Sequence, residues 1–597
     1  MTTSWQYWKS DLAKRLSETV DADVTADDIV IPPDRTLGDF AYGCFKLAKG
    51  LVGSDDRVGR SPADIAKDIA SKIDLGQSDF VSASAAGPYV NFTLSIGEAV
   101  HRVVRDIEVR DPLRLPLEKG ESRGELLLEF AQPNTHKEIH VGHLRNLVLG
   151  QALSNILSAS GWNVVPMSYY GDVGAHVAKC LWWLGKENKE QRAKSSWDAD
   201  DVIAAIPTEK RNGKFLGEMY AEASRQLDAH PEWKDEVSDV QRKLEAHDPA
   251  WEKLWRETRR WSLDEFAAIF DDLGVKIARQ YLESEVVDRG QEMVDHLLKQ
   301  KVAKESQGAI IVDLEDKKLG VFLIRKSDGT SLYATKDLAL AELKLKEHPN
   351  AQRSLIMVDN RQSLYFKQLF ETLDMMELRP VPEFIGYEFV TLKSGAISSR
   401  EGNVVTYQDF RDEIISYSTD EVVKRHVGDK WNDGKIEHAA WCIAMAGMKF
   451  GMLKQDNDKI FTFDLEQSLS FDGDTGPYCQ YAATRLASIL RKAGIKNPFG
   501  ADESLTRGYD HESEKALAFA LAQFPVKVAQ AAEELRPSVV AQWCIDVAQR
   551  VNEFYRDIKV LESEGDVKEG RLRLVSAARS SLVSGLGLLA IPVPDEM

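Results

Sequence analysis

The chain has 597 residues, of which 43% are hydrophobic and 29% are charged, a composition typical of a globular protein with roughly three or four domains. Taken alone, its net charge of -19 argues against nucleic-acid binding, although net charge does not report local basic patches. No Cys-x-x-Cys pair, signal peptide or membrane span is visible, so we expect a cytoplasmic protein with no structural zinc and no membrane contact.

Residues 1–110 predict a small α/β domain. Apolar residues recur at helical spacing over 8–16 and 65–73, and a short strand is expected over 89–94. The polar stretch 111–123 is interpreted as a linker to the next domain.

A strand–helix–strand unit follows the linker. The expected elements are a strand at 126–128, a polar loop at 132–138, a helix from about His143 to Gly161 and a strand at 162–165. This order indicates an α/β fold with a doubly wound parallel, Rossmann-like sheet, in a domain that we place at 120–410. Ligands of such sheets bind at the carboxyl ends of the strands, where the polar loop should lie.

The rest of the chain is mostly helical in pattern. Residues 185–300 are highly charged and are interpreted as a mostly helical insertion into the sheet domain. Apolar runs typical of strands return at 310–312, 321–324 and 355–358. We expect a helical connecting segment over 411–470 and an all-α bundle over 471–597.

The sequence His140-Val141-Gly142-His143 lies where a loop is predicted to meet the first turn of a helix. Free backbone N–H groups and the positive end of the helix dipole make such a junction favourable for phosphate. Gly142 lets a nucleotide approach the backbone closely. Paired histidines are more often structural or solvent-exposed, but this position favours a nucleotide site whose imidazoles contact phosphate oxygens.

Several segments resemble those of the class I arginyl-tRNA synthetases. Residues 130–145 are similar to the HIGH region of class I aminoacyl-tRNA synthetases, with the Pro133-Asn134 spacing of the arginyl enzymes. Further resembling segments are 38–40, 87–91, 327–337, 358–368, 473–482 and 591–597. Their order along the chain matches that of the family.

The resemblance implies an arginine–tRNA ligase, which activates L-arginine with ATP to arginyl-adenylate and transfers it to the 3′-terminal adenosine of tRNA(Arg). ATP with its Mg²⁺ is the implied cofactor, tRNA(Arg), L-arginine and ATP are the implied partners, and a monomer is expected. Three alternatives stay open. They are another class I ligase such as a cysteinyl or glutamyl enzyme, a small nucleotidyltransferase, and a non-catalytic synthetase-like tRNA-binding protein.

The second class I signature, KMSKS, is degenerate in this chain. It falls at 396–400, where Ser399 replaces the second lysine. Many arginyl enzymes without that lysine carry one just before the HIGH motif, and Lys137 occupies this position. The resemblance implies Lys137, His140 and His143 as catalytic residues. The implied ATP-binding residues are Lys137, His140, Gly142, His143, Ser398, Ser399 and Arg400.

Recognition of arginine requires acceptors for a planar, permanently charged guanidinium, which carboxylates match by charge-assisted bidentate hydrogen bonds. The resemblance implies Asp337 as the main carboxylate, and Tyr333 faces the same way if this stretch is helical. Glu129, at the end of the first sheet strand, is a second candidate. Asn134 and Gln362 are matched to residues that hold the α-amino and carboxylate groups. The implied arginine-binding residues are Glu129, Gln132, Pro133, Asn134, His143, Tyr333, Asp337 and Gln362.

Contacts with tRNA are expected from both ends of the chain. Asn91 would contact the tRNA elbow, and the C-terminal helices would bind the anticodon loop by base stacking and phosphate contacts. The implied tRNA-binding residues are Asn91, Tyr478, Gln480, Tyr481 and Arg485. The sequence at 171–174 resembles a Gly-Asp-x-Gly motif of the family but is equally a simple turn, and we assign it no role.

Overall fold

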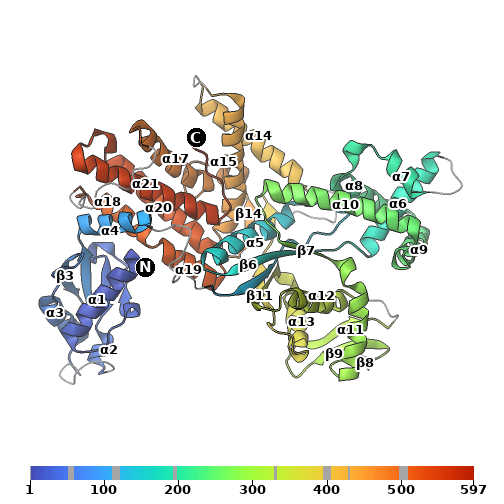
Figure 1. The fold of residues 1–597 in the computed structure, drawn as a ribbon, viewed down its shortest axis with the longest axis horizontal. Coiled ribbons are helices and arrows are strands. Elements are labelled where there is room, and N and C mark those ends of the chain that lie inside the picture. Colours follow the sequence, from blue (N-terminus) through green and yellow to red (C-terminus); the bar gives the residue numbers. More distant parts are fainter. Residues whose placement is uncertain are drawn as a thin grey trace.

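The parts of the chain lie in a row (Figure 1). The computed structural model describes residues 2–50, 59–109, 122–192, 198–327, 332–393, 405–427, 431–495 and 508–597. The N-terminal domain lies beside the C-terminal helices at one end, a parallel sheet lies near the centre, and the helical insertion extends to the other end.

The central sheet consists, within these residues, of five parallel strands in the order β12-β11-β5-β6-β7. Their bounds are β5 Glu125–Glu129, β6 Asn163–Tyr170, β7 Arg279–Leu282, β11 Ala351–Asp359 and β12 Glu383–Tyr387. Because β5 comes first in the chain, the later strands extend the sheet first on one side of it and then on the other. This creates a topological switch point between β5 and β11. The predicted doubly wound parallel fold is confirmed.

Helix α5 Val141–Ala159 connects β5 to β6 and is buried on nearly all sides. His140 is its N-cap, so the helix begins two residues before the predicted start. Gly161 adopts a φ of 93°, and the Trp162 N–H donates to the Leu157 carbonyl at 3.2 Å, which ends the helix close to the predicted place.

Arg145 anchors α5 to the chain that leads into the C-terminal helices. Its fully buried guanidinium donates to the carbonyl oxygens of Glu388 at 2.6 Å, Lys459 at 2.5 Å and Asp456 at 3.1 Å. The carboxylate of Asp456 in turn accepts a hydrogen bond from the Ser538 hydroxyl at 2.7 Å. The second turn of α5 is therefore linked to the C-terminal bundle.

The N-terminal domain packs helices against an antiparallel sheet of the order β1-β2-β4-β3. Its elements are α1 Ser4–Val20, β1 Ile29–Val30, β2 Phe40–Gly43, α2 Phe45–Ala48, α3 Pro62–Lys72, β3 Phe80–Ala86, β4 Tyr89–Leu94 and α4 Ile96–Val109. The predicted helices at 8–16 and 65–73 correspond to α1 and α3, and the predicted strand at 89–94 is β4. The expected linker at 111–123 lies almost wholly outside the described residues.

The segment expected to be a helical insertion contains helices and one strand of the central sheet. Its helices are α6 Ala175–Arg192, α7 Ala199–Ala205, α8 Gly213–Ala229, α9 Lys234–Glu245 and α10 Pro249–Asp272. Strand β7 and helix α11 Val287–Gln300 follow within the same predicted range, 185–300. Strand β7 could not be distinguished from the surrounding helical pattern in the sequence, because it is only four residues long.

The apolar runs at 310–312 and 321–324 do not join the central sheet. They lie in β9 Ala309–Leu314 and β10 Gly320–Arg325, which form a separate antiparallel sheet with β8 Lys304–Ser306. The run at 355–358 does join the central sheet, as part of β11. Helices α12 Tyr333–Glu347 and α13 Ser363–Met375 flank β11 in the chain.

The described residues from 407 onward are helical apart from short connections and one strand. The helices are α14 Tyr407–Arg425, α15 Asp433–Leu453, α16 Leu465–Ser468, α17 Gly476–Lys492, α18 Glu512–Ala522, α19 Phe524–Glu534, α20 Ser538–Asp557 and α21 Gly565–Leu588. Strand β14 Phe461–Phe463 pairs with β13 Val390–Leu392. The predicted C-terminal all-α bundle is confirmed.

The N-terminal domain and the C-terminal bundle share an interface. Phe519 of α18 stacks on Trp8 at 6.3 Å between ring centres and lies 5.5 Å from the Phe40 ring. Arg573 of α21 forms an ion pair with Glu108 of α4. Aromatic packing and a partly buried ion pair thus hold these two parts together.

Two general features of the described chain concern its environment. None of its helices combines the length and the apolar character needed to cross a lipid bilayer. All five cysteines are buried and unpaired.

Gly150 provides a test of the packing around α5. A Cβ at this position would overlap the Phe130 ring, whereas a Cβ at Gly587 of α21 would meet nothing within 4 Å. We predict that Gly150→Ala lowers the midpoint of thermal unfolding, because overpacking by about 1–3 kcal/mol outweighs a helix-propensity gain of about 1 kcal/mol. The control Gly587→Ala should keep or raise the midpoint. Calorimetry of both variants checks this, and a Gly150→Ala midpoint at or above that of the wild type would contradict it.

Candidate active site

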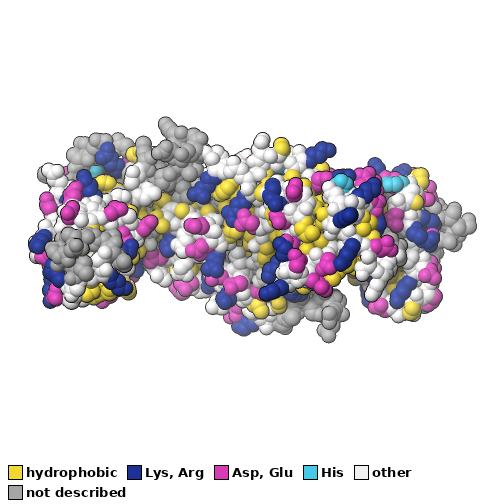
Figure 2. Space-filling model, turned by 90° about the horizontal axis from the view of Figure 1, so that it is seen from below, with side chains coloured by type: hydrophobic (Ala, Val, Ile, Leu, Met, Phe, Trp, Pro, Cys, Tyr) yellow, Lys and Arg dark blue, Asp and Glu magenta, His cyan; other side chains and the backbone are white. Residues whose placement is uncertain are grey.

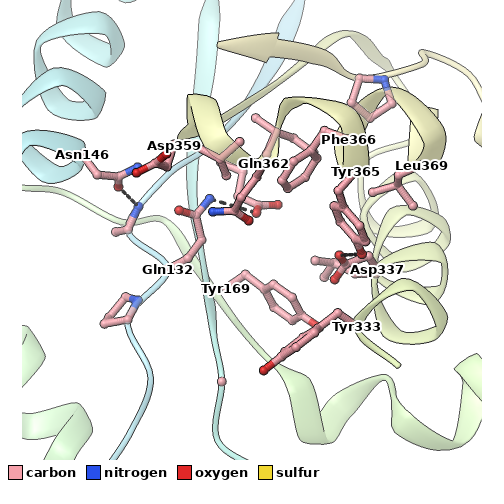
Figure 3. Close-up of a pocket in the computed structure, with 18 of the residues that line it drawn as sticks. Gln132, Asn146, Tyr169, Tyr333, Asp337, Asp359, Gln362, Tyr365, Phe366 and Leu369 are labelled. Carbon is pink, nitrogen blue, oxygen red and sulfur yellow. Dashed lines mark hydrogen bonds between the residues drawn. The ribbon is translucent and has the colours of Figure 1, made fainter. Parts of the chain in front are cut away.

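A cavity of about 700 Å³ lies at the switch point of the central sheet, where β5 ends in Glu129 and β11 ends in Asp359. The loop 131–134, the first turn of α5, and helices α12 and α13 complete its wall. Figure 3 shows polar and aromatic side chains from these elements gathered around the cavity. The sequence placed the ligand site at this loop and at the ends of these strands.

The two histidines of the first turn of α5 have orientations that the backbone fixes. The Gly142 N–H donates to Nδ1 of His140 at 3.0 Å, and the His140 N–H donates to Nδ1 of His143 at 3.2 Å. Because a backbone N–H can only donate, each Nδ1 is an acceptor and the ring proton sits on Nε2. A Cβ at Gly142 would overlap the His140 ring, so the helix cap itself requires this glycine.

Both imidazoles are neutral near neutral pH. Burial, followed by the charge of Lys137, lowers the pKa of His140 to about 4. Burial, followed by His140 and Lys137, lowers the pKa of His143 to about 3. The first turn of α5 therefore offers the cavity two neutral Nε2–H donors beside the positive end of a helix dipole.

Asp337, on α12, lines the cavity and accepts a hydrogen bond from the Tyr365 hydroxyl of α13. Partial burial raises its pKa to about 7; the Tyr365 hydrogen bond opposes this shift, and Glu129 and Glu283 add to it. Among the described residues, Asp337 forms no ion pair. A cation that entered the cavity would stabilise the ionised form of this carboxyl.

The other two carboxylates beside Asp337 already have cationic partners. Glu129 pairs with the buried Lys344 of α12, and Glu283, which follows β7, pairs with Lys336. Glu129, predicted as a second carboxylate for a guanidinium, therefore lines the cavity with its charge already balanced. The three carboxylates and two lysines together leave one uncompensated negative charge, on Asp337. This charge suits a ligand with one positive charge.

The remaining predicted arginine-binding residues also line the cavity. They are Gln132, Pro133, Asn134, His143, Tyr333 and Gln362. Gln132 donates to Glu129 and to the Met357 carbonyl, each at 3.2 Å. The backbone of Asn134 forms an isolated parallel β-bridge with Gly171. A Cβ at Gly171 would overlap the side-chain amide oxygen of Asn134. Tyr333 and Asp337 share α12 as expected, and Tyr333 is 68% exposed.

Lys137, although described, is not among the residues that line the cavity. Its ammonium lies 4.9 Å from the centre of the Tyr220 ring on α8 of the insertion. The preceding His136 is fully buried; its N–H donates to Ser262 at 3.0 Å and its ring contacts Thr258 at 2.9 Å, both on α10. The loop before α5 thus rests on the helical insertion. The predicted ATP-binding residues Ser398, Ser399 and Arg400 lie outside the described residues.

Asp172, to which the sequence gave no role, has a structural one. It is fully buried, pairs with Arg259 of α10 at 2.8 Å, and accepts a hydrogen bond from the Ser284 hydroxyl at 2.7 Å. Ser284 directly follows Glu283, so Asp172 holds the turn that places Glu283 at the cavity.

Three of the predicted tRNA-binding residues form one cluster between α17 and α20. Arg485 donates to Asn552 at 2.8 Å and to the Tyr481 hydroxyl at 3.1 Å, and Asn552 donates to the Tyr478 hydroxyl at 2.8 Å. The Arg485 guanidinium lies 4.6 Å from the Tyr481 and Tyr555 ring centres. Aromatic rings beside a cation are the groups on which single-stranded bases stack.

The other two predicted tRNA-binding residues are buried. Gln480 donates to the carbonyl oxygens of Cys442 at 2.9 Å and Pro592 at 2.6 Å. It therefore ties the bundle to the C-terminal tail, and its position gives no support to an RNA contact. Asn91 lies in β4, and its amide nitrogen has no partner among the described residues.

The charge distribution on one face of the molecule adds no separate signal for RNA. On the face shown in Figure 2, Lys and Arg side chains are mixed with Asp and Glu over the described surface, without one broad basic area. The aromatic cluster of α17 and α20 is therefore more informative than net charge.

Among the cavity residues that the sequence analysis missed are Tyr169, Glu283, Lys344 and Tyr365. Lys344 lies seven residues, or two helical turns, after Asp337, and this spacing could have revealed it. Tyr365 lies within the resembling segment 358–368. Tyr169 lies in the part of β6 beyond its predicted end, and Glu283 follows β7, which was not predicted. No cluster of three or more His, Cys, Asp or Glu residues suited to a metal ion occurs in the described part of the chain.

Comparison with known proteins matches three regions of the chain to family descriptions. Residues 6–94 match "Arginyl tRNA synthetase N terminal domain", 114–465 match "tRNA synthetases class I (R), catalytic domain", and 479–597 match "DALR anticodon binding domain".

Full-length relatives and solved structures agree with these matches. The arginine–tRNA ligase of Bdellovibrio bacteriovorus is 34% identical over 590 residues, which cover 97% of this chain and 96% of that protein. That of Halothermothrix orenii is 32% identical over 580 residues, 95% of each. The structure of Thermus thermophilus arginyl-tRNA synthetase has a TM-score of 0.76 at 26% identity and covers 99% of this chain and 100% of that one.

The raised pKa of Asp337 predicts a pH dependence of guanidinium binding. A guanidinium needs the ionised carboxylate, so affinity for L-arginine should be full above pH 7 and fall about tenfold per unit well below the pKa of about 7. The charged groups facing Asp337 are Glu129, Glu283 and Lys336, and the His140 and His143 pKa values lie too low to contribute.

Calorimetric titration with L-arginine between about pH 5.5 and 8 tests this dependence. The Asp337→Asn variant, which has no titrating carboxyl at this position, should bind weakly and without the dependence. Equal wild-type affinity across this range would contradict the prediction.

Proposed function

Because this chain belongs to the class I arginyl-tRNA synthetases and is an arginine–tRNA ligase, we propose that its cavity binds L-arginine at Asp337 and ATP at the first turn of α5. The class I catalytic domain implies the use of ATP. The observation that carries the proposal is a lone uncompensated carboxylate in the same cavity as the two imidazole Nε2–H donors at the N-terminus of α5.

The guanidinium of arginine would bind Asp337 through two charge-assisted N–H···O bonds. Tyr333, four residues earlier on the same helix, would cover the guanidinium with its ring. Asn134 and Gln362, which line the same cavity, would hold the α-amino and carboxylate groups. A site of this kind rejects ligands that leave its polar groups unpaired.

The phosphates of ATP would lie against α5. The neutral Nε2–H groups of His140 and His143, at the positive end of the helix dipole, are suitable donors. Lys137 would leave its place over the Tyr220 ring to add a positive charge, and Mg²⁺ would accompany the nucleotide. The resemblance also implies Ser398, Ser399 and Arg400, which lie outside the described residues, as contacts of the nucleotide.

The chemistry then needs no covalent bond to the protein. The arginine carboxylate oxygen attacks the α-phosphorus, the bond to the bridging oxygen breaks, and diphosphate leaves. A ribose hydroxyl of the terminal adenosine, the 2′-OH in class I enzymes, next attacks the arginyl carbonyl carbon and AMP leaves. The protein contributes alignment and charge stabilisation, which are the main requirements of both steps.

The DALR domain binds the anticodon region of tRNA(Arg). Within it, Tyr478, Tyr481 and Arg485 are the proposed contacts, since their rings and guanidinium form one cluster. The N-terminal domain would bind the tRNA elbow near Asn91, whose amide nitrogen lacks a protein partner among the described residues. The proposed functional unit is a cytoplasmic monomer without structural zinc.

Removal of the Asp337 carboxylate tests the arginine site. Asp337→Ala should raise the KM for arginine about 100-fold or more, because a buried charge-assisted pair is lost, while tRNA affinity stays unchanged. Aminoacylation kinetics and tRNA binding measure both quantities. Asp316→Ala, on the exposed turn between β9 and β10, is the control and should behave like the wild type. An unchanged arginine KM in Asp337→Ala would reject the assignment.

Charging of total tRNA with each of the twenty amino acids tests the catalytic function against a non-catalytic tRNA-binding protein.

Removal of Lys137 tests the proposed phosphate contact. Lys137→Ala should slow adenylate formation by about two to three orders of magnitude, as expected for loss of one transition-state donor. ATP–diphosphate exchange in the presence of tRNA measures this rate. The matched control is Lys179→Ala, because Lys179 lies 5.2 Å from the same Tyr220 ring and should be dispensable for the reaction. Near-normal exchange in Lys137→Ala would remove the proposed role.

A further inference from the structure

Tyr169, near the end of β6, lines the cavity with a hydroxyl that has no visible function in the fold. This hydroxyl is buried and has no hydrogen-bond partner among the described residues. Buried polar groups without partners are rare, because they lose hydration without regaining a hydrogen bond. Figure 3 shows Tyr169 near Asp337 and Tyr333, which line the same cavity.

The surroundings keep the Tyr169 hydroxyl neutral. Burial, followed by the carboxylates of Asp337, Glu283, Glu129 and Asp172, raises the pKa of this phenol well above its usual value. Tyr169 can therefore supply an oxygen acceptor to the cavity without adding a negative charge.

We propose that Tyr169 is a specificity residue for arginine, whose hydroxyl oxygen accepts an N–H of the guanidinium that Asp337 leaves free. This inference rests on the proposed arginine site. A guanidinium carries five N–H donors and no acceptor, and a bidentate bond to one carboxylate uses only two of them. The nearby Glu129 and Glu283 are already bonded to lysines.

A neutral acceptor fits the charge balance of the cavity better than another carboxylate would. Asp337 already balances the single charge of a guanidinium, so a further unpaired carboxylate would leave a buried charge without a partner. A hydroxyl satisfies another N–H and leaves this balance unchanged. Ligands that cannot donate to both Asp337 and Tyr169 leave one of them unpaired in the closed site.

The adjacent Tyr170 provides a matched control on the same strand. Successive side chains of a strand point to opposite faces, and Tyr170 packs 5.5 Å from the Phe266 ring in the core and is absent from the cavity wall. Both hydroxyl groups are buried, so Tyr169→Phe and Tyr170→Phe each remove one buried hydroxyl and differ in the face of the sheet that they affect.

Aminoacylation kinetics of the full chain test the inference, with Asp337→Ala measured alongside. Tyr169→Phe should raise the KM for arginine about tenfold or more, as expected for loss of a hydrogen bond to a charged group. Its kcat at saturating arginine and its KM for ATP should stay within about twofold of the wild type. Tyr170→Phe should leave the arginine KM unchanged.

A second measurement does not depend on turnover. Arginine should raise the midpoint of thermal unfolding of the wild type and of Tyr170→Phe by the same amount, and that of Tyr169→Phe by less. This comparison also covers the case in which Tyr169→Phe is poorly active.

The outcomes separate this inference from the function on which it rests. A wild-type arginine KM and a full thermal shift in Tyr169→Phe, together with a raised KM in Asp337→Ala, would overturn the role of Tyr169 alone. If neither variant raises the arginine KM, the arginine site lies elsewhere and both proposals fail. A fall in kcat with no change in the arginine KM would assign Tyr169 a structural role and also overturn the inference.

Discussion

The organisation of this site depends on one carboxylate that the protein leaves without a cation. Asp337 lies beside Glu129 and Glu283, and three ionised carboxylates so close together would repel one another strongly. Lys344 and Lys336 balance two of them, and the third stays available to a ligand. The specificity of the cavity is therefore a property of the whole charge set.

The fold brings this charge into the same cavity as the first turn of α5. Glu129 ends β5 and Glu283 directly follows β7, whereas Asp337 and Lys344 come from the helix that precedes β11. Residues from distant parts of the chain therefore line one cavity at the carboxyl ends of the strands. The amino acid and the nucleotide can therefore occupy adjoining parts of one cavity. The insertion contributes from outside, because its helices α8 and α10 support the loop that carries His136 and Lys137.

Much of the site could be predicted because its signals are local in sequence. His140 and His143 mark a helix start, and Asp337 shares one helix with Tyr333, so spacing and resemblance together selected residues that line one cavity. Tyr169 was missed because β6 runs five residues beyond its predicted end at Val165.

The signals that failed concern burial and pairing between distant segments. Gln480 is polar, and polar residues usually lie at the surface, but it is buried against the C-terminal tail. The strands at 310–312 and 321–324 look like those of the central sheet, since an apolar run does not specify its partner strand. The pairing of Lys344 with Glu129, 215 positions apart, likewise requires the folded chain.

The backbone contacts of Arg145 impose a mechanical condition on α5, whose first turn lines the cavity. Its guanidinium holds carbonyl oxygens at 456 and 459, and Ser538 at the start of α20 holds the side chain of Asp456. If a bound RNA shifts α20, either these hydrogen bonds break or α5 moves with it. His140 and His143 lie at the start of the same helix as Arg145, so a movement of α5 would displace both histidines together. The Arg145 contacts thus couple the position of α20 mechanically to the cavity wall.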